Sequence, residues 1–158
     1  MTIAIYPGSF DPITNGHLDI LKSGSEIFEK VIIAVSYNVN KKGFLSVDER
    51  VDLIKKSVAS LRNVEVDSFE GLTVEYAKRK GADVLLRGLR TSFDFEYELQ
   101  LSQTNNALNN DLKTVFLITK PEYNFISSSM VREILINKGD ITNFVPAEVK
   151  KYLLTRGI

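Results

Sequence analysis

The sequence I-A-I-Y-P-G-S-F-D-P-I-T-N-G-H, residues 3–17, decides the fold of this chain. It begins with an apolar run that predicts a strand over residues 2–6, and a helical pattern near residues 16–28 follows. His17, the only histidine in the chain, lies at the start of that helix. At a strand-to-helix turn, free backbone N–H groups and the positive end of the helix dipole face a ligand, which suits the turn to a phosphate.

Outward from this turn, apolar β-rich runs alternate with helical patterns. Because such alternation implies right-handed crossovers and a parallel sheet, we expect a single α/β domain over residues 1–158. It is predicted to be Rossmann-like, with a parallel five-stranded sheet and helices on both faces. The other predicted strands are residues 31–36, 64–69, 84–86 and 114–119, and the other predicted helices are residues 47–61, 72–80, 93–109, 129–137 and 146–154.

Composition excludes several classes of protein. Lysine plus arginine equals aspartate plus glutamate, which argues against bulk binding of nucleic acid. The absence of cysteine excludes disulfides, thiolate metal sites and a cysteine nucleophile, and a single histidine excludes a multi-histidine metal site. No apolar run is long enough to span a membrane, and Pro7 and Gly8 interrupt the first run too early for a signal peptide. We therefore expect a cytoplasmic protein.

The residues best suited to a ligand follow the predicted strands. Residues 7–17 follow the first strand, 38–42 the second, 87–90 the fourth and 120–129 the fifth. Ligands of open α/β sheets bind in the crevice outside the carboxyl ends of the strands. Because these loops are basic or suited to phosphate, the sequence predicts one highly anionic site there.

Three blocks of sequence carry a resemblance to a known family. Residues 8–17 match the signature G-[ST]-F-D-P-x-x-x-G-H of the nucleotidyltransferases with a T/HxGH motif. The blocks R-G-L-R-T-S-F-D-F-E-Y-E, residues 87–98, and Y-N-F-I-S-S-S-M-V-R, residues 123–132, narrow it further. With them the chain resembles the bacterial phosphopantetheine adenylyltransferases over essentially its whole length. Residues 91–93 and Thr104 depart from the family's frequent residues near the acceptor pocket or subunit contacts.

The resemblance implies the nucleotidyltransferase fold and a specific reaction. The adenylyl group of ATP is transferred reversibly to 4′-phosphopantetheine, giving dephospho-coenzyme A and pyrophosphate in coenzyme A biosynthesis. Also implied are Mg²⁺ bound with ATP, feedback inhibition by coenzyme A and a homohexamer arranged as a dimer of trimers. Because the acceptor phosphate is already an anionic nucleophile, such catalysis needs positioning and charge neutralisation rather than a strong base.

The same resemblance implies roles for individual residues. His17 is implied to stabilise the pentavalent phosphorus and is the expected catalytic residue. The acceptor site is implied to contain Ser9, Lys41, Thr73 and Arg87. The ATP site is implied to contain Ser9, Phe10, His17, Gly88, Leu89, Arg90, Glu98, Tyr123, Asn124, Phe125, Ile126, Ser127, Ser128 and Ser129.

Simpler interpretations exist for several of these residues. Lys41 with its neighbour Lys42 is also typical of a solvated loop, Glu98 of an exposed helix position, and the three serines of a helix cap. The aromatic residues between 93 and 97 are also typical of a packing or oligomer surface. The alternative functions are another T/HxGH enzyme, such as nicotinate-mononucleotide adenylyltransferase or glycerol-3-phosphate cytidylyltransferase, and a non-catalytic nucleotide sensor.

Overall fold

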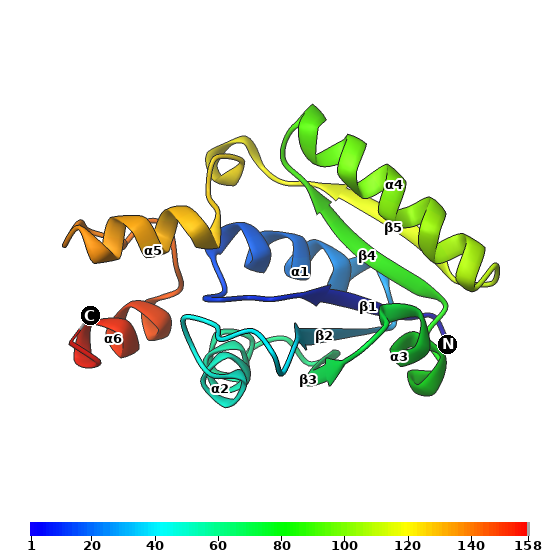
Figure 1. The fold of residues 1–158 in the computed structure, drawn as a ribbon, viewed down its shortest axis with the longest axis horizontal. Coiled ribbons are helices and arrows are strands. Elements are labelled where there is room, and N and C mark those ends of the chain that lie inside the picture. Colours follow the sequence, from blue (N-terminus) through cyan, green and yellow to red (C-terminus); the bar gives the residue numbers. More distant parts are fainter. Residues whose placement is uncertain (158) are drawn as a thin grey trace.

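A parallel five-stranded sheet forms the centre of the protein, in the order β3-β2-β1-β4-β5 (Figure 1). The computed structural model describes residues 1–157. Strand order reverses at β1, because β2 and β3 lie on one side of it and β4 and β5 on the other. All four pairings are parallel, which confirms the predicted sheet. The strands are β1 (Ile3–Gly8), β2 (Lys30–Tyr37), β3 (Val64–Glu70), β4 (Val84–Leu89) and β5 (Lys113–Ile118).

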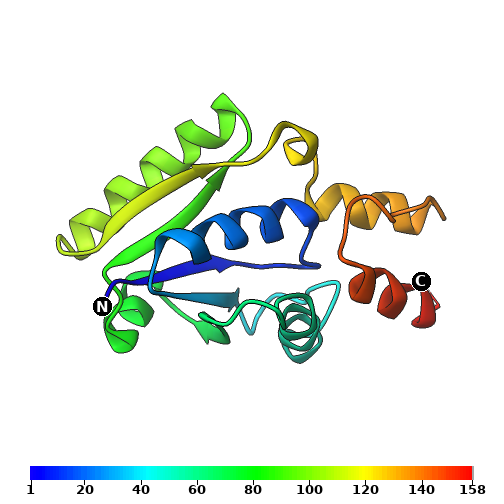
Figure 2. The same ribbon diagram turned by 180° about the vertical axis from the view of Figure 1, so that it is seen from behind.

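Helices cover both faces of this sheet, as the sequence predicts. The helices α1 and α2 pack on one face, and α3 and α4 lie on the other (Figures 1 and 2). The last two helices lie beyond the carboxyl ends of β1 and β2 (Figure 1). The helices are α1 (Asn15–Ile27), α2 (Val47–Ser57), α3 (Thr73–Lys80), α4 (Ser92–Leu108), the short 3₁₀ helix η1 (Pro121–Tyr123), α5 (Ser128–Ile136) and α6 (Ala147–Thr155).

The strand β2 shows why both faces are buried. Side chains along a strand alternate between the two faces of its sheet. Val31, Ile33 and Val35 pack in the core beneath α1 and α2, whereas Ile32 and Ala34 pack in a second core with α3. None of the five is more than 1% exposed. A continuous apolar run is therefore what this position in the sheet requires.

The strand β4 is longer than the sequence predicts. The expected strand covers residues 84–86, but β4 continues to Leu89 because it pairs with β5 as far as Leu89 and Ile118. Arg87 and Gly88 therefore lie on the strand and not in the loop after it. The direction of the Arg87 side chain is consequently set by the sheet. The predicted helices also omit η1, and α2 ends at Ser57, before the expected residue 61.

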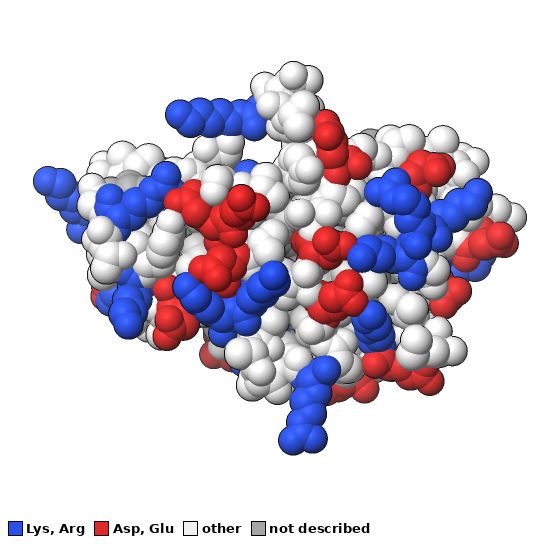
Figure 3. Space-filling model, turned by 90° about the horizontal axis from the view of Figure 1, so that it is seen from below, with Lys and Arg blue, Asp and Glu red and all other residues white. Residues whose placement is uncertain are grey.

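Charges of both signs are interspersed on the face of the molecule that Figure 3 shows. Three ion pairs lie along β3. Nζ of Lys30 is 2.6 Å from a carboxylate oxygen of Glu65, and Nζ of Lys80 is 2.6 Å from one of Asp67 and 3.4 Å from one of Glu65. The mixture agrees with the equal numbers of acidic and basic residues in the sequence.

Within residues 1–157, no helix is both long enough and apolar enough to cross a membrane.

The helix α4 exposes an apolar surface. Among its residues only Glu98 is buried, whereas Phe93 and Tyr97 are 82% and 66% exposed. Ile118, at the end of the neighbouring strand β5, is 82% exposed. Large apolar side chains exposed together often mark a surface that contacts another protein.

Candidate active site

Two adjoining cavities open at the carboxyl ends of the strands. The inner cavity, of about 350 Å³, lies among the end of β1, the first turn of α1, the end of β4 and the first turn of α5. The outer cavity, of about 1050 Å³, lies beside the loop that follows β2. Ser9 lines both cavities, so the loop after β1 forms their common wall.

The inner cavity gathers most of the residues that the sequence singles out. They come from segments far apart in the chain, and their convergence confirms that the predicted loops meet at one edge of the sheet. Their individual roles stay predictions. The predicted residues that line this cavity are Ser9, Phe10, His17, Arg87, Gly88, Arg90, Glu98, Ile126, Ser127, Ser128 and Ser129.

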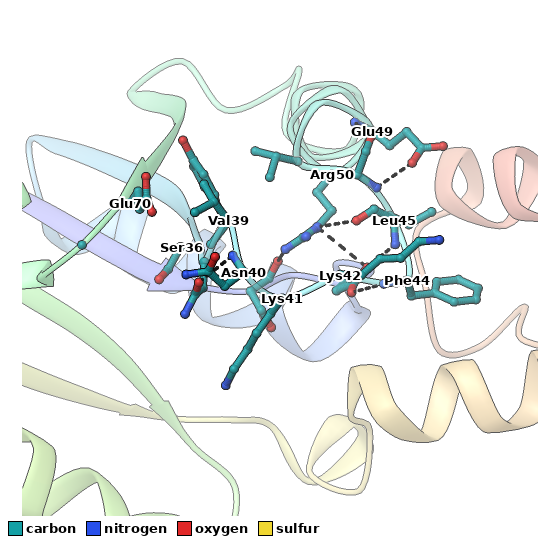
Figure 4. A pocket seen from close by; sticks show the side chains of 18 of the residues that line it. Ser36, Val39, Asn40, Lys41, Lys42, Phe44, Leu45, Glu49, Arg50 and Glu70 are labelled. Carbon is teal, nitrogen blue, oxygen red and sulfur yellow. Dashed lines mark hydrogen bonds and ion pairs between the residues drawn. The ribbon is translucent and has the colours of Figure 1, made fainter.

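Lys41 lies in the outer cavity, on the loop after β2 (Figure 4). The side chains of Lys41 and Lys42 extend from this loop in different directions (Figure 4). Proximity along the chain therefore does not make the two lysines equivalent toward a ligand. The predicted residues that line neither of these two cavities are Thr73, Leu89, Tyr123, Asn124 and Phe125.

His17 is held by a capping box at the start of α1. The side chain of Thr14, the N-cap residue, accepts a hydrogen bond from the backbone N–H of His17 at 3.3 Å. In return, Nδ1 of the His17 ring accepts from the backbone N–H of Thr14 at 3.1 Å. This is the usual reciprocal box of helix N-termini, with a histidine where glutamate or glutamine commonly stands. It explains why Thr14 and His17 are separated by two residues.

The capping box also selects the tautomer of His17. Because Nδ1 accepts a hydrogen bond, the hydrogen of the neutral ring resides on Nε2. Burial, together with the positive charges of Arg90 and Arg87, lowers the pKa of His17 from 6.5 to about 4. The ring therefore presents a neutral N–H donor to the inner cavity at neutral pH.

We expect an NMR titration of the ligand-free protein to show His17 gaining its proton near pH 4, with the Nε2–H tautomer above that pH. The unfolded chain takes up this proton near pH 6.5, so acidification between pH 6.5 and 4 favours unfolding. As the chain has one histidine, the signals need no assignment by mutation. A midpoint near 6.5, or a hydrogen on Nδ1, would contradict this environment.

The Phe10 ring packs against the ring of His17. Phe10 is 2% exposed, and its ring packs edge-on against the rings of Tyr6 and His17, with centroids 5.2 and 5.1 Å apart. Its φ of 45° lies in the left-handed region, which side-chain-bearing residues seldom adopt. A Cβ atom at Gly8 would lie 2.9 Å from the Phe10 ring, so glycine is required for this close approach.

Arg87 and Glu98 form a bidentate ion pair between β4 and α4. The Nε and Nη2 atoms of Arg87 donate to the two carboxylate oxygens of Glu98 at 2.8 and 2.6 Å, and Nη1 donates to the carbonyl of Pro7 at 3.0 Å. Although burial opposes its charge, the pairing with Glu98 raises the pKa of Arg87. Glu98 thus fixes the guanidinium at the cavity wall, which is a simpler account of its burial than a direct contact with ATP.

Two further arginines line the inner cavity. Arg90 pairs with Asp94 and donates from Nη1 to the carbonyl of Ile126 at 2.9 Å, which connects the start of α4 to the loop before α5. Arg132 of α5 donates to the carbonyl of Asp11 at 2.7 Å. Within residues 1–157, no carboxylate pairs with Arg132, so its charge is balanced least among the three arginines.

Of the three serines at the start of α5, one is the helix cap that the simpler interpretation predicts, and another makes a contact to the loop after β1. Ser127 is the N-cap, and its side chain accepts from the backbone N–H of Met130 at 3.1 Å. The hydroxyl of Ser128 donates to the carbonyl of Pro12 at 2.7 Å, which fastens α5 to the loop after β1. The N-termini of α1 and α5 therefore meet at the inner cavity, and both favour negative charge.

Several residues of the site are absent from the sequence-based prediction. Thr14 and Arg132 line the inner cavity, and the T-x-x-H spacing of a capping box and the S-x-x-R spacing on a helix are signals that point to them. Asp19 is 6% exposed and accepts from the backbone N–H of Lys120 at 3.1 Å, so it fixes the loop after β5. Nothing local in the sequence identifies that contact.

Known proteins share this sequence and fold. Residues 5–134 match the profile of the Cytidylyltransferase-like family. The chain is 49% identical over 156 residues to the phosphopantetheine adenylyltransferase of Clostridium perfringens (strain SM101), covering 99% of this chain and 95% of that protein. It is 54% identical over 146 residues to the phosphopantetheine adenylyltransferase of Synechococcus elongatus, covering 92% and 88%.

A solved structure shares the fold at low sequence identity. The Vibrio parahaemolyticus protein, described as a nicotinate-nucleotide adenylyltransferase, matches with a TM-score of 0.74 and 20% identity over 98% of this chain and 99% of its own. That likeness bears on the fold alone, and it confirms the predicted nucleotidyltransferase architecture. The sequence identities above extend over nearly the full length of both chains compared. The chain belongs to the phosphopantetheine adenylyltransferases, within the Cytidylyltransferase-like family.

Proposed function

We propose that this protein transfers the adenylyl group of ATP to 4′-phosphopantetheine, giving dephospho-coenzyme A and pyrophosphate. The reaction is reversible and belongs to coenzyme A biosynthesis. The observation that carries the proposal is the inner cavity, where a neutral histidine N–H, three arginines and two helix N-termini face the same space. A site of this kind suits a highly anionic transition state, and the reaction requires no covalent nucleophile from the protein.

In the proposed mechanism, an oxygen of the acceptor phosphate attacks the α-phosphorus of ATP, and the bond from that phosphorus to the pyrophosphate oxygen breaks. Nε2–H of His17 donates a hydrogen bond as negative charge builds on the reacting phosphoryl group. Arg132 and the N-termini of α1 and α5 line the inner cavity, and in this proposal they stabilise the phosphates of ATP. Arg87 lines the inner cavity, Lys41 lines the outer cavity and Ser9 lines both; in this proposal the two cations hold the acceptor phosphate.

The donor set suits a magnesium ion that binds together with ATP. The carboxylates of the inner cavity, Asp94 and Glu98, are each paired with an arginine. Within residues 1–157, histidine and acidic side chains nowhere gather in threes as a metal cage. Such an ion would take its ligands from phosphate oxygens and water, and when bound it would neutralise part of the phosphate charge.

The test is to incubate the protein with ATP and 4′-phosphopantetheine and to detect dephospho-coenzyme A by mass. Parallel reactions with nicotinate mononucleotide and ATP, and with glycerol 3-phosphate and CTP, test the related enzymes. The proposal is supported if product forms with 4′-phosphopantetheine and ATP and with neither of the other two substrate pairs. Turnover only with another acceptor, or nucleotide binding without any turnover, would overturn it.

The cytoplasm is the proposed site of this reaction.

Coenzyme A contains the whole of the product dephospho-coenzyme A plus one phosphate, so it is expected to compete for the same cavities. If coenzyme A competes in this way, its inhibition of the reaction should increase when both substrates are dilute.

A homohexamer, arranged as a dimer of trimers, is the expected assembly. It is supported by the exposed apolar side chains of Phe93 and Tyr97 on α4 and of Ile118 on β5. We expect sedimentation at micromolar concentration to give six times the 17.8 kDa of the chain. The variant Phe93→Glu should shift the protein to smaller species, because it places a charge in the contact. A monomer at every concentration would contradict the assembly.

A further inference from the structure

The carboxylate of Asp11 connects two loops that carry predicted ligand-binding residues. Asp11 is 8% exposed, although aspartate is seldom buried without partners. Its Oδ2 accepts from the backbone N–H of Phe44 and its Oδ1 accepts from that of Leu45, both at 2.8 Å. Asp11 follows β1, whereas Phe44 and Leu45 belong to the loop after β2. The carboxylate thus satisfies two successive N–H groups of the other loop.

Arg50 completes this connection from α2 (Figure 4). It is 6% exposed, and its Nε donates to the carbonyl of Leu45 at 3.0 Å while Nη1 donates to the carbonyl of Ser9 at 3.1 Å. Its Nε also lies 3.8 Å from Oδ1 of Asp11. A Cβ atom at Gly43 would lie 2.5 Å from Nη2 of Arg50, so the backbone passes close to the guanidinium. We call Asp11 and Arg50, with their contacts to residues 43–45, the loop clasp.

The loop clasp bounds the segment that carries Lys41. Residues 38–42 are exposed. They form a turn in which the Lys41 N–H donates to the Asn38 carbonyl and the Asn40 N–H donates to the Asn38 side chain. This short segment is fixed at one end by β2 and at the other by the clasp. Because an exposed lysine loses rotamer and backbone freedom when it binds a phosphate, fixing its loop in advance reduces that loss.

We infer that Asp11 and Arg50 are positioning residues for the acceptor, since they hold the Lys41 loop at a set place beside Ser9. Both side chains line the outer cavity together with Lys41, and in this inference they act on the acceptor through Lys41. The inference rests on the proposed function. It predicts that loosening the clasp raises the KM for 4′-phosphopantetheine far more than the KM for ATP, because His17, Arg90 and Arg132 are held by contacts that do not involve the side chains of Asp11 and Arg50.

The test uses Asp11→Asn, Lys41→Ala and the double variant. Asparagine keeps the shape of Asp11, but its amide NH₂ then faces one of the two backbone N–H groups. We expect Asp11→Asn to raise the KM for 4′-phosphopantetheine about tenfold, as for loss of one charge-assisted hydrogen bond, with the KM for ATP changed less than about twofold. In the Lys41→Ala background the same change should raise the acceptor KM by less than about twofold, because the residue it positions is gone.

The matched control is Asp67→Asn on β3. Asp67 also accepts a backbone N–H, from Ser68, and the hydroxyl of Tyr76, both at 2.8 Å, and it lines neither cavity. This variant should keep both KM values of the parent protein. If it raises the acceptor KM as much as Asp11→Asn, the effect is general loosening and the inference is wrong.

The remaining outcomes also decide the question. Full additivity of Asp11→Asn and Lys41→Ala, equal increases in the two KM values, or parental kinetics would each overturn the inference. If Asp11→Asn does not fold, Arg50→Lys is tested in the same way, and failure of both to fold would show a role in stability alone. The parent enzyme is assayed first, so that lack of turnover with 4′-phosphopantetheine counts against the proposed function and is distinguished from failure of the clasp.

Discussion

Replacement of His17 by alanine is expected to lower kcat by about 10²–10³, the usual effect of removing one preorganised hydrogen-bond donor from a transition state. The ring is half-buried at the cavity, and its capping box turns Nε2–H into a fixed donor. A contact that strengthens as charge builds acts on kcat, so the KM for ATP should change less. Steady-state kinetics with both substrates measure this division.

The same substitution has a second effect, because His17 also caps α1. Loss of the acceptor for the Thr14 N–H should cost about 1 kcal/mol of stability. His17→Gln is the matched control, since glutamine is a common partner in capping boxes. We expect His17→Gln to melt near the parent temperature while kcat stays low. Parental kcat in His17→Ala, or its recovery in His17→Gln, would show that the imidazole is not the essential donor.

Arg87→Ala is expected to lose both acceptor binding and stability, whereas Lys41→Ala should lose acceptor binding alone. Removal of Arg87 leaves the carboxylate of Glu98, whose side chain is 10% exposed, without its partner. Breaking a buried pair from one side typically costs about 3–5 kcal/mol. Lys41 is exposed on its loop, so its removal leaves no buried charge behind. Each variant also loses a charge-assisted contact to phosphate, worth about 1.5–3 kcal/mol.

Thermal melts and KM values for the two substrates separate these effects. In the Arg87→Ala background, Glu98→Gln should recover part of the lost stability because it removes the unpaired charge. It should not recover the KM for 4′-phosphopantetheine, since the guanidinium is still absent. An Arg87→Ala protein that melts like the parent would contradict the pairing, and a larger rise in the KM for ATP than for the acceptor would contradict the assignment of Arg87.

The sequence predicts the fold well because the signals that set it are local. The apolar run of β2 and the motif that ends at His17 each identify an element and its place in the sheet. The convergence of four loops then follows from the parallel order alone. The signature of residues 8–17 likewise identifies His17 as the residue to examine, and the capping box supplies the physical reason for its spacing.

Side-chain pairing was harder to predict from sequence. The contact between Arg87 and Glu98 depends on β4 extending past residue 86 and on the direction in which α4 crosses it. The contact of Asp11 with residues 44 and 45 likewise depends on how two loops pack. Sequence patterns describe the face on which a residue lies, but a bidentate contact requires orientation in three dimensions. Thr73 lines neither cavity, and its predicted contact with the acceptor stays a prediction.

The hydrogen bonds between the loop after β1 and α5 affect the order in which the parts of this protein fold. Ser128 and Pro12 are 116 residues apart in the chain, and Arg132 and Asp11 are 121 apart. A ribosome-bound chain that ends before residue 128 therefore contains β1 and His17 but lacks the wall that closes the inner cavity. Contacts of such separation form late, because the intervening chain must first be ordered. If ATP binds the inner cavity as proposed, we expect it to stabilise the chain only after this wall has formed, and so to favour the last step of folding.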